Sequence, residues 1–104
     1  MSRGPDVTTL LERRLLLAGQ AGGHGITIEG IESTPWASAT FNGARHRFRL
    51  AGRATAELEA WLQALPEAEL PLRGHLVADL EMLSSKVDGE RLCAEIEVLT
   101  VEER

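Results

Sequence analysis

The residues that could support acid–base, nucleophilic or metal chemistry are few and scattered along this 104-residue chain. No two of the three histidines, His24, His46 and His75, stand at the spacing of a metal-binding pair. The only cysteine, Cys93, has Glu95 two residues away, on the same side of a predicted strand. A neighbouring carboxylate makes a thiol a poor nucleophile. We therefore predict no catalytic residue, no metal site and no cofactor.

A stretch of alternating arginines is more informative. Residues 41–50 read FNGARHRFRL, with Arg45, Arg47 and Arg49 at every second position. Successive side chains of a strand point to opposite faces, so these arginines share one face and Phe48 lies on the other. Platforms for single-stranded nucleic acid need aromatic rings and cations on the same face. With a net charge of −5, this arrangement predicts that nucleic acid is not a partner.

The last part of the chain carries the opposite charge. We expect residues 75–101 to form a hairpin with a three-residue loop that places Gly89 in the left-handed conformation and pairs Met82 with Ala94. In this register, carboxylates and apolar side chains share the face that points away from the core. They are Asp79, Glu81, Glu95 and Glu97, with Val77, Leu83, Leu99 and Val101 beside them.

Two arrangements would satisfy these charges. The basic strand could contact the acidic strands of a second copy across a two-fold axis, because such a contact pairs each patch with its complement twice. Alternatively, the basic strand could lie beside an acidic strand in the same sheet, which would leave a monomer. We favour the first arrangement.

The elements that position these residues follow from the apolar periodicity. A helix is expected from Asp6 to Ala18, with Asp6 or Thr9 as its N-cap. The Gly-rich segment 19–25 is predicted to be a hinge, and the strand that follows is predicted to bulge at Glu29-Gly30.

The central part of the chain is predicted to contain a turn, a tight hairpin and a second helix. Thr34-Pro35 is expected to turn the chain, and Asn42-Gly43 is expected to form the tip of the hairpin, which places Trp36 opposite Arg49. Apolar residues at helical spacing predict the second helix from Thr55 to Leu65, stopped by Pro66.

These elements give the order α-β-β-β-α-β-β. We predict an α+β fold of two layers, with an antiparallel sheet of about five strands and two helices on one face. Length and composition (43% apolar, 26% charged) predict one domain over residues 1–104, with residues 1–5 disordered. The leucine-rich start is interrupted by charges, so we expect a cytoplasmic protein with no membrane partner.

The functional prediction is a homo-oligomer, most simply a dimer, that acts through its surface as an interaction or adaptor protein without catalysis. The alternative is a small-ligand-binding protein or minor enzyme with a cleft near the 19–25 loop and the 66–74 connection. The predicted interaction surface consists of Trp36, Arg45, Arg47, Arg49, Asp79, Glu81, Glu95, Glu97, Leu99 and Val101.

Overall fold

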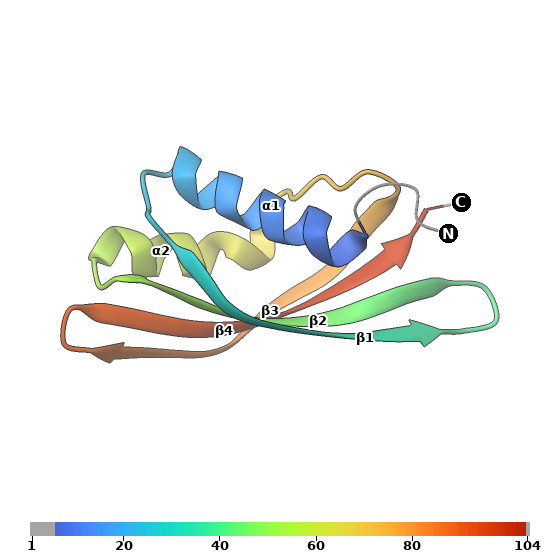
Figure 1. Cartoon of the computed structure of the whole chain (residues 1–104). Coiled ribbons are helices and arrows are strands. Elements are labelled where there is room, and N and C mark those ends of the chain that lie inside the picture. The colour runs from blue at the N-terminus through green and yellow to red at the C-terminus, as the bar shows by residue number, and fades with distance from the viewer. Residues whose placement is uncertain (1–5, 104) are drawn as a thin grey trace.

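The computed structural model describes residues 6–103, so the predicted disorder of residues 1–5 lies outside the described residues. Within these residues, two α-helices, four strands and one short 3-10 helix make up the fold (Figure 1). In chain order they are α1 (Val7–Ala21), β1 (Thr27–Ala37), β2 (Asn42–Arg53), α2 (Ala56–Ala64), η1 (Leu65–Glu67), β3 (His75–Asp88) and β4 (Arg91–Glu102).

The prediction of an α+β fold with an antiparallel sheet is confirmed, but the sheet has four strands rather than five. Its order is β1-β2-β4-β3, and every neighbouring pair is antiparallel. The predicted turn at Thr34-Pro35 is wrong, because β1 continues through both residues to Ala37. Proline has no N–H to donate, and an edge strand such as β1 tolerates it because one side of the strand has no partner.

Both helices lie on the same face of the sheet (Figure 1). Helix α1 buries Leu11 and Leu15, and α2 buries Leu58 and Leu62, each pair at i and i+4 on one side of its helix. These side chains form one core with inward residues of the strands, among them Phe48, Leu80, Ile96 and Val98. The opposite face of the sheet carries neither helix.

The ends of α1 are set by local hydrogen bonds. Asp6 is the N-cap, and its carboxylate accepts a hydrogen bond from the Thr9 N–H at 2.9 Å, so Thr9 is not the cap. The helix runs three residues beyond the predicted end at Ala18 and includes Gly19, the first residue of the predicted hinge. The connection from α1 to β1 is therefore 22–26.

The first hairpin turns earlier than predicted. Residues 38–41 form the turn, closed by a 2.8 Å hydrogen bond from the Ser38 N–H to the Phe41 carbonyl oxygen. Asn42 and Gly43 lie inside β2, so the prediction that they form the tip is wrong. Trp36 pairs with Gly43 rather than with Arg49.

The second hairpin has a two-residue turn at Gly89 and Glu90. Gly89 adopts the predicted positive φ, at 64°. Met82 pairs with Ile96 instead of Ala94, which shifts the predicted register by two residues and leaves the facing of the central residues unchanged. Register shifts between Val77 and Asp79, and between Met82 and Ser84, add two bulges that were not predicted.

The predicted bulge in β1 is present between Ile28 and Gly30. Each of the two edge strands, β1 and β3, is therefore interrupted by at least one bulge. The 38–41 turn and the 89–90 turn lie at opposite ends of the twisted sheet (Figure 1). The molecule is elongated along the strands, with extents of 45 × 24 × 22 Å.

Candidate functional site: the uncovered face of the sheet

The face of the sheet that points away from both helices is called the outer face below. Strand β4 shows the alternation most clearly, because Ile96, Val98 and Thr100 are buried toward the helices and the residues between them are partly exposed. Strand pairing then assigns the other residues to this face. It includes Glu32, Thr34, Trp36, Gly43, Arg45, Arg47, Arg49, Leu76, Asp79, Glu81, Ser84, Glu95, Glu97, Leu99 and Val101.

All ten residues of the predicted interaction surface therefore lie on one face. Glu32 and Thr34 were not predicted to belong to it, because the expected turn at Pro35 divided β1, and Leu76 was not predicted either. Val77 was assigned to the outer face, but the bulge at Ala78 turns it toward the core and brings Leu76 to the outer face instead. Val77 pairs with the buried Thr100 and packs against the core, whereas Leu76 pairs with Val101 and is 55% exposed.

The basic strand lies beside an acidic strand within the same sheet. The Arg47 guanidinium is 3.4 Å from the Glu97 carboxylate, and Arg45 is 3.8 Å from the same group. Arg49 is 3.8 Å from the Glu95 carboxylate. The arginine side chains are about half exposed, and exposed pairs of this kind contribute about 0–1 kcal/mol each, so they leave the cations accessible.

Three carboxylates of the outer face, Glu32, Asp79 and Glu81, form no ion pair with any residue from 6 to 103. Glu32 belongs to β1, whereas Asp79 and Glu81 belong to β3 and are separated from the arginines of β2 by β4. A hollow of about 180 Å³ extends over β2, β4 and β3, and its lining is Arg45, Asp79, Glu81, Glu97 and Leu99. The outer face thus has a paired basic centre and an unpaired acidic margin.

One end of the outer face is apolar. Trp36, Gly43, Val101 and Leu76 form a single row across the four strands, and Leu99 belongs to the next row. Trp36, Leu99 and Val101 are partly buried by their neighbours. The predicted apolar character of this face is therefore present, with Leu76 in place of Val77. Leu83, which the sequence also assigned here, is the extra residue of the second β3 bulge and is 39% exposed.

A chain of hydroxyl groups surrounds the buried His46 on the helix side. Its Nδ1 is 2.8 Å from Ser33 Oγ, and its Nε2 is 2.9 Å from Thr100 Oγ1. The Thr100 hydroxyl donates its proton to the Ala44 carbonyl oxygen, so it accepts from Nε2–H and leaves Nδ1 to accept from Ser33. Burial lowers the pKa of His46, and the Asp6 carboxylate opposes this shift. The imidazole is a neutral core group whose two ring nitrogens are hydrogen-bonded to side-chain hydroxyl groups.

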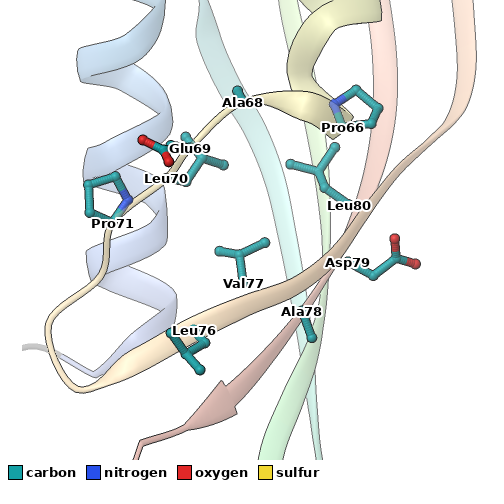
Figure 2. A pocket seen from close by; sticks show the side chains of 10 residues that line it. All are labelled: Pro66, Ala68, Glu69, Leu70, Pro71, Leu76, Val77, Ala78, Asp79 and Leu80. Atoms are coloured by element: carbon teal, nitrogen blue, oxygen red, sulfur yellow. The ribbon is translucent and has the colours of Figure 1, made fainter.

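Two hollows lie near the segments where a ligand cleft was predicted, and they share no lining residue. The larger, about 540 Å³, lies between the 66–71 connection and β3 (Figure 2). Val77 and Leu80 extend toward the connection, whereas the Asp79 carboxylate points away from it (Figure 2). The smaller, about 320 Å³, is lined by Gly23, His24, Gly25, Arg53, Thr55 and Leu58.

The remaining reactive group on the outer face is the free thiol of Cys93. It is partly buried and pairs across strands with Ala51 and Lys86. Within residues 6–103, no cluster of three or more His, Cys, Asp or Glu side chains is arranged to hold a metal ion. In the same part of the chain, neither helix has the length and apolarity needed to cross a membrane.

In comparisons with known proteins, no family model and no curated protein matches this sequence.

Proposed function

We propose that this chain is a non-catalytic interaction protein that associates with a second copy of itself through the outer face of its sheet. The observation that carries this proposal is the apolar end of that face, formed by Trp36, Leu76, Leu99 and Val101, next to the unpaired carboxylates of β3. Apolar side chains surrounded by charges are typical of a protein–protein contact. Neither helix covers them.

The unpaired carboxylates of the acidic margin favour a partner whose contact surface is positively charged. Asp79 and Glu81 have no cation within the described residues, while the arginines of β2 remain about half exposed despite their ion pairs. A second copy would bring its own accessible arginines to these carboxylates, while its own carboxylates contact the arginines of the first copy. A contact of this kind sets orientation and specificity more than affinity, which the apolar residues must provide.

The alternative of a small-ligand binder or enzyme has less support. The 540 Å³ hollow has only two charged residues, Glu69 and Asp79, and Asp79 points away from the connection (Figure 2). Ligand pockets usually combine apolar walls with several converging polar groups. A cytoplasmic location is part of the proposal, and the lone free thiol of Cys93 supports it because reducing compartments keep thiols unpaired.

Sedimentation velocity over a wide concentration range tests the proposal, with Leu99→Asp as the disrupting variant. We expect a monomer–dimer equilibrium for the parent protein and a monomer for Leu99→Asp, because the aspartate would replace an apolar side chain of this end with a charge. Leu17→Asp is the matched control, since Leu17 is 53% exposed on α1. It should associate like the parent.

Two results would contradict the proposal. A parent protein that stays monomeric at every concentration has no self-association to explain. A dimer that survives Leu99→Asp but is lost in Leu17→Asp is held by α1, where Leu16 and Leu17 are both exposed. Circular dichroism of each variant establishes that the fold is retained.

A further inference from the structure

The strand register assigns each residue of the outer face to a row across the sheet. One row is Thr34, Arg45, Leu99 and Asp79, and the next is Glu32, Arg47, Glu97 and Glu81. In both rows an arginine of β2 and an unpaired carboxylate of β3 lie on either side of β4. Neighbouring strands are about 4.8 Å apart, so each arginine and its row carboxylate are separated by about 10 Å along the sheet.

From this symmetry we infer that two copies pack outer face to outer face about a two-fold axis that runs parallel to β4. The inference rests on the proposed function and specifies its geometry. Such an axis keeps each row at its own height and exchanges the two sides of β4. It therefore places Arg45 opposite the Asp79 of the partner and Arg47 opposite the Glu81 of the partner, with each contact formed twice.

Two other positions of the axis would place like charges opposite each other. An axis between β2 and β4 would place Glu32 opposite the Glu81 of the partner. An axis along β2 would place Glu32 opposite the Glu97 of the partner. Of these three positions, only the one along β4 brings the unpaired carboxylates of β3 to arginines, and like charges opposite one another suppress wrong arrangements.

The axis position also joins the apolar ends of the two chains. Leu99 and Val101 lie on β4, so each meets the same residue of the other copy. Gly43 occupies the position opposite the Leu76 of the partner, and the indole of Trp36, which lies over Gly43, offers that leucine an apolar surface. Sheets packed face to face keep their strands within about 30° of alignment and about 10 Å apart, which this arrangement allows.

Two pairs of like charges remain on the axis, because Glu95 and Glu97 each meet the same residue of the partner. Each Glu97 carboxylate already has Arg45 and Arg47 within 4 Å, and each Glu95 carboxylate has Arg49 within 4 Å. Six guanidinium groups would surround four carboxylates, and this leaves a net positive centre that attracts the acidic margins. The hollow beside Arg45 and Asp79 gives the incoming side chains space.

A charge exchange between two variants tests the axis. Asp79→Arg places two arginines opposite each other at both contacts of its homodimer, and Arg45→Asp places two aspartates there. We expect each variant alone to dimerise at least about tenfold more weakly than the parent, because two attractions become two repulsions. An equimolar mixture restores both contacts, so the mixed dimer should return to within about threefold of the parent affinity.

Matched controls carry the same charge changes on the helix side. Glu57→Arg and Arg13→Asp alter exposed residues of α2 and α1. Neither should change the dissociation constant of the dimer, alone or mixed. Circular dichroism and thermal melts confirm that all four variants fold.

The outcomes separate this inference from the proposed function. If the parent is monomeric, both are overturned. If the parent dimerises and the single variants are as tight as the parent, or are weak and not restored by mixing, the axis along β4 is wrong while self-association stands. Restoration in the mixture, with no effect of the controls, supports the axis.

Discussion

The indole ring of Trp36 lies directly over Gly43 on the neighbouring strand. A Cβ atom at residue 43 would come within 2.7 Å of the ring carbon Cζ2 and would clash with the backbone oxygen of Thr100. Gly43 does not have a positive φ, so the requirement for glycine here is close approach rather than a left-handed turn. The Trp36 Nε1 is also buried and has no hydrogen-bond acceptor among the described residues.

We therefore expect Gly43→Ala to lower the free energy of unfolding by about 1–3 kcal/mol or more, because the methyl group must displace backbone as well as a ring. Urea unfolding measures this loss. Gly25→Ala is the control, since a Cβ atom at residue 25 would have nothing within 4 Å and the φ of Gly25 is not positive. Equal stability of Gly43→Ala and the parent would show that Trp36 does not pack on residue 43.

Thr55 caps the second helix, and its hydroxyl accepts a hydrogen bond from the Leu58 N–H at 3.0 Å. Thr55→Ala should cost about 0.5–2 kcal/mol of stability, because it leaves that N–H without its cap. Thr55→Ser retains the hydroxyl and should recover most of the loss in the same unfolding measurement. Similar losses in both variants would place the effect outside the cap.

The lowered pKa of the buried His46 predicts how the free energy of unfolding depends on pH. Because burial lowers its pKa in the folded state, the unfolded chain binds the proton more readily. The folded state should therefore have its full stability above pH 6.5, the ordinary histidine value, and lose stability as the pH falls through the depressed folded-state pKa.

The free energy of unfolding, measured by urea titration between pH 7.5 and pH 5, tests this sign. His46→Gln should flatten the decrease, although it should also lower stability at neutral pH by disturbing the bonds to Ser33 and Thr100. The matched control is His24→Gln, which should keep the decrease. A parent protein whose stability is constant or rises toward pH 5 would contradict the assignment of His46 as a neutral buried group.

Cross-linking gives a test of the dimer that does not depend on charge. In a Cys93→Ser background, Val101→Cys should be joined to its counterpart by a short bismaleimide, because Val101 lies on the proposed axis. Ser84→Cys, on β3 in the same background, lies away from the axis and should react far less. Equal cross-linking at both positions would indicate random collision between chains.

The faces of individual strands could be predicted from the sequence, because alternation depends only on the strand being a strand. This is why Arg45 and Arg47 lie on one face of the sheet and His46 on the other, although the predicted hairpin register was wrong. The bulge at Glu29-Gly30 was also predictable, and the cap at Asp6 was one of two predicted candidates, since each depends on a few neighbouring residues.

Features that depend on distant contacts were not predictable in the same way. Asn42-Gly43 has the composition of a tight turn, but Gly43 is needed to let Trp36 and Thr100 approach. The bulge at Ala78 depends on how β3 follows β4, and nothing in the local sequence marks it. Strands β2 and β4 are adjacent, and their contact between Arg47 and Glu97 joins residues 50 positions apart in the chain. The sequence left open whether the basic strand contacts an acidic strand of its own sheet or of a second copy.

Pro35 and the bulges have a consequence for how large an assembly can become. An unbroken edge strand offers a continuous template on which further chains can add without limit, as in fibrils, and proline and bulges interrupt such templates. Here both lateral edges carry interruptions, at Glu29 and Pro35 on β1 and at Ala78 and Leu83 on β3. The proposed two-fold contact through the outer face is complete with two copies. We therefore expect the chain to resist polymerisation, so concentrated solutions should hold particles of fixed size that bind no amyloid dye.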